Sequence, residues 1–276
     1  MPELPEVEHV VRALRRAIVG RCIVDAELKL KRIAPKISRS SFCRRLRGTR
    51  IESVSRRGKH ILIRLDTTLV LLAHLRMTGK FVSLSADQPL PAYSHVIFHL
   101  DNTRRLVFCD MRQFGRMRLL PASFVERSPE LRSLAPEPLS DAFSIDYFYS
   151  TVGRSRRSLK QLLLDQTKIL GLGNIYAAEA LFLARINPFR KGASVSRQRL
   201  VNLHGAIKSI LQEAIDSGST LRIDLHDGEA SYFGRTERFW QVYDREGFPC
   251  TRCGRLIRRV IRAGRSTYFC PQCQRR

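Results

Sequence analysis

The sequence contains no apolar run approaching the roughly 20 residues that cross a membrane, and its first residues lack the basic and apolar segments of a signal peptide. We therefore expect no membrane-spanning helix, no membrane partner and a cytoplasmic location. With 276 residues, 43% of them hydrophobic, the chain is long enough to form more than one domain with a core of its own.

Acidic residues are also scarce. The chain has 25 Asp and Glu against 49 Lys and Arg, a formal net charge of +24. An excess of this size on a chain with an ordinary hydrophobic content predicts a polyanionic partner. Since no basic amphipathic anchor is apparent, nucleic acid is favoured over an acidic membrane surface, although charge alone does not distinguish DNA from RNA.

Nothing in the cysteine pattern requires disulfide bonds. Four of the seven cysteines form two Cys-x-x-Cys knuckles separated by 16 residues: Cys250, Cys253, Cys270 and Cys273. This spacing is typical of a closed tetrahedral zinc–thiolate site, and the segment between the knuckles is too short and basic to form a core unaided. We predict one structural Zn²⁺ that folds this segment and takes no part in chemistry. The other three are expected to be small buried residues: Cys22, Cys43 and Cys109.

The first residues contain groups capable of covalent chemistry. Removal of Met1 would leave Pro2 with a secondary amine, and an α-amino group has a pKa of about 7.7–8.0, which leaves a neutral fraction near neutral pH. Attack of that amine on an aldehydic carbon would give a positively charged iminium. Glu3 and Glu6 lie close enough in the sequence to move protons. In the alternative interpretation, Pro2 is simply a common second residue and the glutamates favour the start of a helix.

Apolar spacing predicts one helix followed by a set of strands. Helical spacing runs from Pro5 to Ile18, and Gly20 suits the helix end. Between about residues 22 and 120 the pattern changes to short alternating or apolar runs, which are typical of a β-sandwich or barrel. The expected strands are 23–30, 51–55, 60–65, 69–75, 95–100, 106–109 and 116–120.

Three turns in this region carry basic residues. The run 56–59 precedes a strand and places Lys59 at a strand edge, as either a phosphate contact or a solvated charge. The turns at 74–80 and 110–115 combine arginine with large apolar residues. Those apolar residues either anchor a hairpin end in the core or form a wedge that enters between bases.

A proline-rich segment at 121–140 indicates an interdomain linker, and the chain after it is helical. The predicted helices cover 141–152, 158–166, 174–185 and 196–217. Asn174 follows two glycines and is placed to cap its helix, where exposed backbone N–H groups could hold a phosphate. Between the cysteine knuckles, 256–261 and 266–269 predict a hairpin. Its turn carries Arg265, as either a phosphate or groove contact or an ordinary turn arginine.

Four motifs occur in the order found in one protein family. They are Pro-Glu-Leu-Pro-Glu-Val-Glu from Pro2, Arg-Gly-Lys at 57–59, Leu-Leu-Leu-Asp-Gln followed by Gly-Leu-Gly-Asn-Ile-Tyr within 162–176, and the four-cysteine hairpin ending Thr-Tyr-Phe-Cys-Pro-Gln-Cys-Gln. Together they resemble the bacterial formamidopyrimidine-DNA glycosylases over residues 2–274. Leu4-Pro5 resembles this branch rather than the related endonuclease VIII branch.

The resemblance implies an α+β protein of three domains: an N-terminal β-sandwich with an N-terminal helix at 1–130, a helical helix–two-turn–helix domain at 131–235, and a C-terminal β-hairpin zinc finger at 236–276. It implies a monomer, associated with the nucleoid, that binds double-stranded DNA containing oxidised bases or abasic sites. The reaction would remove oxidised purines such as 8-oxoguanine and formamidopyrimidines after the damaged base is flipped out of the duplex.

The resemblance also implies roles for individual residues. Pro2 would attack the sugar C1′, Glu3 would act as general acid and base, and Glu6 would support the site. Lys59 would assist β-elimination, and Arg265 would act in δ-elimination and bind a phosphate. Contacts to the DNA would come from seven further residues: Met77, Tyr93, Arg112, Phe114, Arg156, Lys160 and Asn174. Met77, Arg112 and Phe114 would fill the gap that the flipped base leaves.

Some positions depart from the family pattern. Tyr93 stands where a DNA-contacting histidine is frequent, Ala178 replaces a frequent acidic or serine residue, and Ser231 and Gly234 alter a stretch that borders the flipped base. Two other functions stay open. One is a glycosylase of the same fold that acts on oxidised pyrimidines, and the other is a non-catalytic zinc-dependent DNA-binding protein, which would not need an intact terminus.

Overall fold

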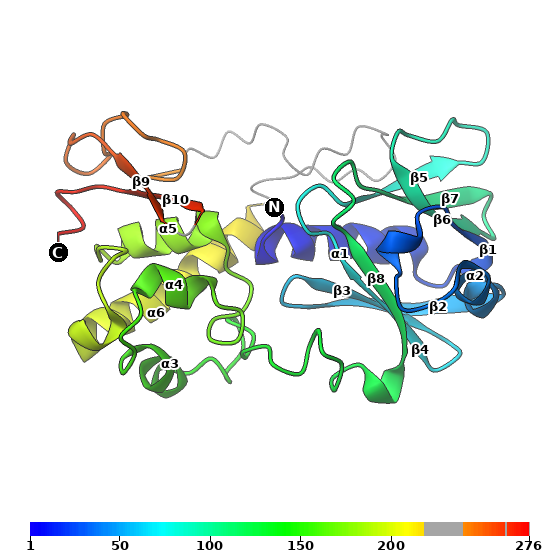
Figure 1. The fold of residues 1–276 in the computed structure, drawn as a ribbon, viewed down its shortest axis with the longest axis horizontal. Coiled ribbons are helices and arrows are strands. Elements are labelled where there is room, and N and C mark those ends of the chain that lie inside the picture. Colours follow the sequence, from blue (N-terminus) through cyan, green and yellow to red (C-terminus); the bar gives the residue numbers. More distant parts are fainter. Residues whose placement is uncertain (218–239, 263, 276) are drawn as a thin grey trace. The chain divides into compact units, whose positions relative to one another are not determined.

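The computed structural model describes residues 1–217, 240–262 and 264–275 (Figure 1). These residues fall into two compact units. The first is Met1–Arg132, and the second comprises the described residues from Ser133 onward. Within the described part of the chain, no helix combines the length and the apolar character that crossing a membrane requires.

The first unit consists of a helix, α1 (Leu4–Ile18), and one antiparallel sheet of eight strands in the order β5-β7-β6-β1-β2-β3-β4-β8. The strands are β1 (Cys22–Leu28), β2 (Thr49–Arg57), β3 (His60–Leu65), β4 (Leu69–His74), β5 (Lys80–Ser85), β6 (Ser94–Leu100), β7 (Arg104–Cys109) and β8 (Arg116–Pro121). β1 and β2 pair only at Cys22↔Arg50 and Ile23↔Thr49, so this short seam joins two four-stranded halves.

Side chains from both halves of the sheet and from α1 form a single core in this unit. Phe98 and Phe108 come from one half, Ile63 and Met117 come from the other, and Leu14 comes from α1. Two faces that share one apolar interior form the predicted sandwich. Two elements of this unit were not predicted from the sequence, the strand β5 and the helix α2 (Arg39–Leu46).

The local sequence explains why α1 starts where it does. Its apolar residues recur at helical spacing and are buried, Pro5 occupies the first turn, and the chain leaves the helix at Gly20 with φ +82°. At the other end, Glu3 and Glu6 form a capping box in which each carboxylate accepts the other residue's backbone N–H. The capping box holds the first residues of the chain in a defined conformation.

The second unit is helical and ends in a small hairpin. Its helices are α3 (Ile145–Val152), α4 (Leu159–Leu164), α5 (Asn174–Leu183) and α6 (Arg197–Asp216), and the hairpin pairs β9 (Arg258–Arg262) with β10 (Arg265–Phe269). α5 is apolar on all sides and packs against α4, α6 and β10. Short 3₁₀ turns occur at Lys31–Ile33, Ala122–Phe124 and Gly192–Ser194. The predicted fold class, including the helical region and the cysteine hairpin, is confirmed.

Candidate functional site

The start of the chain brings together four groups that can carry charge. Pro2 is buried, and the side chains of Glu3, Glu6 and Lys59 are only 2%, 4% and 6% exposed, whereas Met1 is 42% exposed. Glu6 Oε2 accepts the backbone N–H of Glu3 at 2.8 Å. Removal of Met1 would therefore uncover an amine that two carboxylates and a lysine surround.

The terminal amine, carried here by Met1, has perturbed acidity. Burial lowers its pKa below the ordinary value of 8.0, Glu3 and Glu6 oppose that shift, and the positive charges of Lys59 and Arg112 add to it. A lowered pKa increases the neutral fraction of an amine near neutral pH, and only the neutral form can attack carbon.

Lys59 is held by a turn between β2 and β3 that an ion-pair network supports. Gly58 has φ +56° in this turn, and the Arg56 guanidinium donates to Gly58 O at 3.0 Å and to Glu8 Oε2 at 3.0 Å. Burial raises the pKa of Glu8, but the hydrogen bonds and charges of Arg56 and Arg12 together outweigh it and lower the pKa overall. Arg12 contacts the same carboxylate from the solvent side.

Sequence reasoning did not single out Glu8 or Arg56. Glu8 follows Glu6 in the same motif, and Arg56 stands within the basic run before Lys59. In the sequence, Glu8 is only an acidic residue in the second turn of a helix, and Arg56 is only a cation before a turn. Both features are typical of a solvated surface. Only the fold brings the two side chains together.

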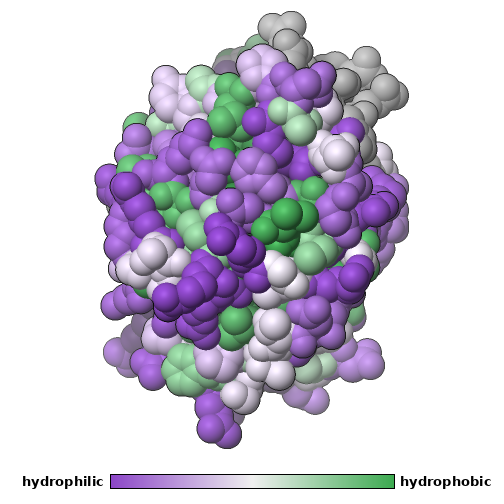
Figure 2. All heavy atoms as spheres, turned by 90° about the vertical axis from the view of Figure 1, so that its right-hand side faces the viewer, coloured by the Kyte–Doolittle hydropathy of each residue, from purple (hydrophilic) through white to green (hydrophobic). Residues whose placement is uncertain are grey.

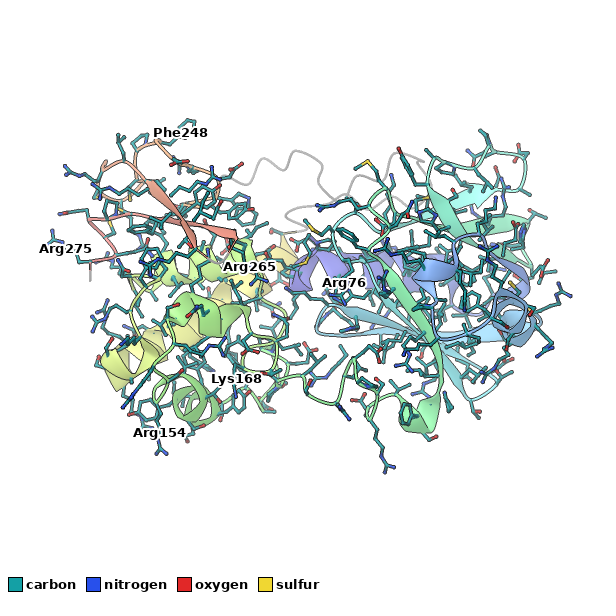
Figure 3. The ribbon with its side chains drawn as sticks, in the orientation of Figure 1. Arg76, Arg154, Lys168, Phe248, Arg265 and Arg275 are labelled. Atoms are coloured by element: carbon teal, nitrogen blue, oxygen red, sulfur yellow. The ribbon has the colours of Figure 1, made fainter. Side chains whose placement is uncertain are left out.

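Two turns of the first unit expose the large side chains predicted to form a wedge. Met77 and Phe114 are each 38% exposed, and the Arg112 guanidinium lies over the Phe114 ring at 4.9 Å. Arg76, in the same turn as Met77 (Figure 3), has φ +56°. Tyr93 is 54% exposed with φ +62°, and its carbonyl accepts the backbone N–H of Asp110 at 3.1 Å. These side chains are thus available to a partner rather than anchored in the core.

In the second unit, Gln166 holds the glycine turn that precedes α5. Its Oε1 accepts the Gly171 N–H at 2.9 Å, and its Nε2 donates to Leu172 O at 2.9 Å and to Leu164 O at 3.2 Å. The Leu-Leu-Leu-Asp-Gln and Gly-Leu-Gly-Asn motifs are therefore physically joined. Asn174 itself does not cap the helix as predicted, because Gly173 is the N-cap residue and Asn174 is the first helical residue. Its Oδ1 has no hydrogen-bond partner among the described residues.

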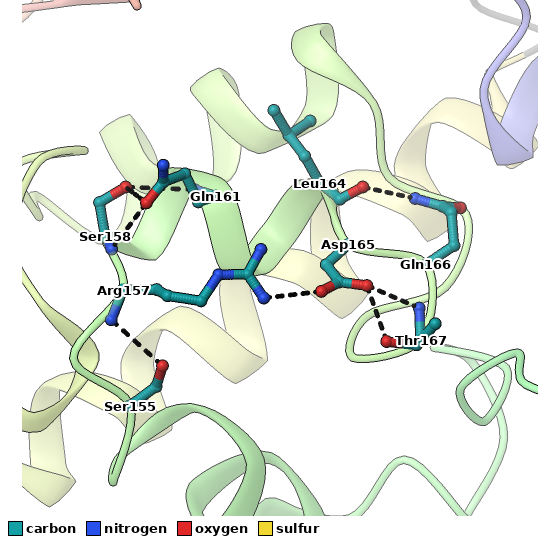
Figure 4. A network of polar contacts seen from close by, with 8 residues as sticks. All are labelled: Ser155, Arg157, Ser158, Gln161, Leu164, Asp165, Gln166 and Thr167. Carbon is teal, nitrogen blue, oxygen red and sulfur yellow. Dashed lines mark hydrogen bonds and ion pairs between the residues drawn. The ribbon is translucent and has the colours of Figure 1, made fainter. Parts of the chain in front are cut away.

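A second polar network connects the two ends of α4 (Figure 4). Arg157 Nη1 donates to Asp165 Oδ2 at 2.8 Å, and Thr167 donates to Asp165 Oδ1 from its backbone N at 3.1 Å and its Oγ1 at 2.7 Å. Ser158 and Gln161 form a capping box at the helix start. The neighbouring Arg156 is exposed, so its side chain can meet a ligand at this helix end.

Lys160 lies inside this unit rather than on its surface. It is 5% exposed, and its Nζ donates to Ser266 O at 2.6 Å and to Thr267 Oγ1 at 3.0 Å. Those two residues directly follow Arg265, the first residue of β10. Arg265 is exposed beside the hairpin turn (Figure 3). Lys160 thus links α4 to the strand that carries Arg265.

A cavity of about 480 Å³ lies beside this link. Basic side chains from the start of α4 and from the hairpin contribute to its lining: Arg157, Lys160, Arg262 and Arg265. Arg262 lies over the Phe189 ring at 4.5 Å, which holds one wall of the cavity. The predicted phosphate-binding residue of the hairpin, Arg265, therefore lines a concave basic surface.

The four predicted metal ligands form one cluster in the hairpin. The Sγ atoms of Cys250, Cys253, Cys270 and Cys273 all lie within 4.8 Å of one another. The Cys250–Cys273 and Cys253–Cys270 Sγ pairs are 3.9 and 3.5 Å apart, which brackets the separation of about 3.8 Å expected in a tetrahedron with Zn–S bonds of about 2.3 Å.

The surroundings of these thiols also suit a metal. The backbone N–H groups of Arg252 and Cys273 point at the sulfurs of Cys250 and Cys270, at 3.4 and 3.3 Å. Burial and the neighbouring thiols raise the pKa of Cys273 to about 12, whereas a backbone hydrogen bond from Arg255 lowers the pKa of Cys253 to about 7, so all four thiols would lose their protons together only with a cation among them. The four cysteines are a structural zinc site, as predicted.

The face drawn in Figure 2 is largely hydrophilic, and its apolar side chains gather in small separate groups. A sandwich with buried carboxylates at the start of its helix, a helical unit with an ordered glycine turn, and a basic zinc hairpin are together the features of one class of protein, the zinc-containing DNA-repair enzymes.

Comparison with known proteins specifies the family. The chain matches the formamidopyrimidine-DNA glycosylase N-terminal domain over residues 1–117, the formamidopyrimidine-DNA glycosylase H2TH domain over 134–224, and the zinc finger found in FPG and IleRS over 247–276. The formamidopyrimidine-DNA glycosylase of Heliobacterium modesticaldum is 44% identical over 278 residues, covering 100% of both chains.

Solved structures agree. Two complexes of the Lactococcus lactis Fpg match with TM-scores of 0.91 and 0.92 at 33% and 34% identity. The first contains DNA with an abasic site, and the second, formed by a mutant of that protein, contains Fapy-dG DNA; they cover 99% and 100% of this chain and 100% of their own. The chain belongs to the formamidopyrimidine-DNA glycosylase family, whose members are DNA glycosylases with AP lyase activity. Ser231 and Gly234 lie outside the described residues.

Proposed function

We propose that this chain excises oxidised purines from duplex DNA and then cleaves the resulting abasic site, with the amine of Pro2 as nucleophile. The observation that carries the proposal is the geometry of the terminus, where buried Pro2 lies beside the groups whose charges act on the terminal amine, Glu3, Glu6 and Lys59. A non-catalytic DNA-binding protein would have no use for an amine in such surroundings, because burying charged groups costs free energy.

The first step replaces one bond at the sugar C1′ by another. The neutral Pro2 nitrogen attacks C1′, and the bond from C1′ to the damaged base breaks with its electron pair leaving on the base. The base takes up a proton, and the nitrogen gives up its own, which restores the nitrogen lone pair. Glu3 protonates the sugar ring oxygen so that the ring opens, and the nitrogen–carbon bond becomes a cationic iminium. Glu6 fixes the backbone of Glu3 through the 2.8 Å hydrogen bond.

Elimination then uses the iminium as an electron sink. Loss of a proton from C2′ expels the 3′ phosphate in β-elimination, with Lys59 assisting proton transfer. A second elimination expels the 5′ phosphate, and Arg265 binds that phosphate as it leaves. Water finally releases the sugar fragment from Pro2. The zinc takes no part in these steps, since four thiolates fill its coordination.

Recognition would be divided between the two units. Met77, Arg112 and Phe114 would occupy the space that the flipped base leaves, and Tyr93 would contact the DNA beside them. In the second unit, Asn174 and Arg156 would bind backbone phosphates, and Lys160 would act through β10. We further propose that the enzyme works as a cytoplasmic monomer with three domains, 1–130, 131–235 and 236–276, which the three separate family segments support.

Borohydride trapping tests this function, because the reagent reduces an iminium to a stable covalent link. The unaltered chain should be trapped on duplex DNA that contains 8-oxoguanine or an abasic site. Pro2→Gly, with a primary amine in a less constrained terminus, should lose most trapping and cleavage while it still binds the DNA. Full cleavage by the Pro2→Gly variant, or faster excision of oxidised pyrimidines than of oxidised purines, would refute the proposal.

A further inference from the structure

The two turns that carry the wedge residues meet on one buried ring. The first follows β4 and contains Met77 and Gly79, and the second follows β7 and contains Phe114 and Gly115. A Cβ atom placed on Gly79 or Gly115 would lie 2.8 or 2.6 Å from Cζ of Phe108, closer than side chains pack. Glycine at both positions therefore lets the two turns pack against the same Phe108 ring.

One buried carboxylate joins these turns. Asp110 is 0% exposed. Its Oδ2 accepts the Gly115 N–H at 2.6 Å, and its Oδ1 accepts the Arg112 N–H at 3.3 Å and the hydroxyl of Thr78. Thr78 Oγ1 in turn accepts the Arg112 N–H at 3.1 Å. Because Thr78 directly follows Met77, the carboxylate bridges the two turns that carry the wedge.

Burial of this charge needs a reason beyond stability. A buried carboxylate costs free energy unless several donors satisfy it, and a neutral residue of similar size often stabilises a fold equally well. These donors to Asp110 come from the two turns, and the backbone carbonyl of Asp110 also bonds to His95 Nε2 at 2.8 Å. The network is thus concentrated where Met77, Arg112 and Phe114 leave the protein surface.

We propose that Asp110 is a positioning residue for base eversion. It touches no DNA; it fixes the separation of the two turns so that Met77 and the stacked Arg112–Phe114 pair enter the duplex together. The inference rests on the proposed function. A wedge made from two turns works only if the side chains of both turns enter the duplex at the correct separation. A misplacement of about 1 Å can lower a reaction rate roughly 100-fold.

Two near-isosteric variants test this role. Asp110→Asn exchanges one acceptor oxygen for an NH₂ group, which cannot accept the N–H or hydroxyl that now bonds there. Thr78→Val removes the hydroxyl that links the turns while leaving Asp110 intact. Asp101→Asn is the matched control, because Asp101 is exposed in the β6–β7 turn and its carboxylate accepts one backbone N–H, from Cys22 at 3.1 Å.

Two reactions separate positioning from general damage to the enzyme. Excision of 8-oxoguanine requires the base to be everted, whereas borohydride trapping on a preformed abasic site requires only the sugar to reach the amine. In single-turnover experiments, Asp110→Asn and Thr78→Val should slow excision by roughly tenfold or more and trapping by less than about threefold. A 2-aminopurine placed beside the lesion should show less unstacking in both variants. Asp101→Asn should match the unaltered chain.

The outcomes are distinguishable from failure of the proposed function. If the unaltered chain forms no trapped complex, the function itself is wrong. If it does, and the two variants lose excision and trapping equally or lose neither, Asp110 has no separate positioning role. Should Asp110→Asn melt at a much lower temperature than the unaltered chain, the Thr78→Val result decides, because that variant keeps the buried carboxylate and most of its donors.

Discussion

At the scale of single residues, the acidity of one amine decides whether the chain terminus can react with a sugar carbon. Most proteins leave the terminal amine solvated, with an ordinary pKa of about 8. Here burial comes first among the influences that lower the pKa, and Lys59 and Arg112 reinforce it, while Glu3 and Glu6 oppose it. The two carboxylates thus offset part of the repulsion that Lys59 and Arg112 exert on the protonated amine. They also lie close enough to move protons.

The pH dependence of trapping follows from these signs. The rate of covalent capture on abasic DNA should rise with pH as the Pro2 amine loses its proton, with a midpoint below the ordinary value, because burial, Lys59 and Arg112, which lower the pKa of the Met1 amine, would act on the Pro2 amine next to it. Replacing Lys59 by Met removes a positive charge that lowers the pKa, so the midpoint should move to higher pH. Single-turnover trapping between about pH 5 and 9 measures it. Lys29→Met serves as control because Lys29 pairs with Glu27 on the surface. Identical midpoints for all three proteins would contradict this account of the amine.

Arg56 provides a second prediction at this scale. Its guanidinium joins Glu8 of α1 to the carbonyl of Gly58, which precedes Lys59. Arg56→Met should therefore lower kcat for abasic-site cleavage by about tenfold with little change in KM, because the DNA contacts stay intact while Lys59 loses its support. Arg12→Met removes a partner from the exposed side of the same Glu8 and should change kcat by less than about twofold. Equal effects of the two substitutions would show that only the charge of Glu8 matters.

At the scale of elements, the zinc hairpin determines where Arg265 stands. The β9–β10 pair is short and its outer strand is mostly exposed, so its own apolar contacts are few. The cysteine cluster at its base and the two hydrogen bonds from Lys160 supply the missing constraint. A two-stranded hairpin without such support is marginal in water.

Loss of the metal should accordingly weaken DNA binding without unfolding the first unit. Cys253→Ser, or prolonged chelation, is expected to reduce affinity for lesion-containing duplex by at least about tenfold, because the metal-dependent folding energy is large. Fluorescence anisotropy measures the affinity, and circular dichroism should retain the β-sheet signal. Cys43→Ser changes a cysteine outside the cluster and should bind like the unaltered chain. Undiminished binding by a zinc-free protein would refute this role.

The elements also show how far the sequence alone could be interpreted. Strong periodicity and distinctive spacing predicted α1, α6 and the cysteine cluster, because burial of one face and metal ligation leave direct traces in the sequence. β5 was missed because it contains serines. Ser83 is 2% exposed only because Arg104 from β7 donates to its hydroxyl at 3.0 Å, a contact between distant residues. α2 was missed because only Phe42 and Leu46 are buried among its eight residues.

The functional residues divide in the same way, into those that a sequence motif reveals and those that only the fold reveals. Side chains named from motifs were found beside one another at the terminus, but the supporting residues Glu8, Arg56, Gln166 and Asp110 emerged only from the fold. Each of them acts through a group far from it in sequence or across a turn, and such hydrogen bonds leave no periodic pattern. Asn174 shows the opposite case, since its residue type suited a cap but the helix began one residue earlier.

At the scale of the whole molecule, a net charge of +24 gives the protein a strong attraction for any duplex, damaged or not. Affinity alone therefore says little about function. What distinguishes this chain from a general DNA-binding protein is that Pro2 is buried beside Glu3, Glu6 and Lys59, which can move protons. DNA binding and catalysis should therefore be separable at a single residue, Met1.

A comparison of the processed chain with one that retains Met1 and a short N-terminal extension tests this claim most directly. Both proteins should bind abasic duplex with affinities within about threefold of each other, because the extension leaves the basic surfaces untouched. Only the processed chain should form a borohydride-stable complex, since the extension converts the Pro2 amine into an amide without a nucleophilic lone pair. Covalent trapping of the extended chain at the same rate as the processed one would contradict the account.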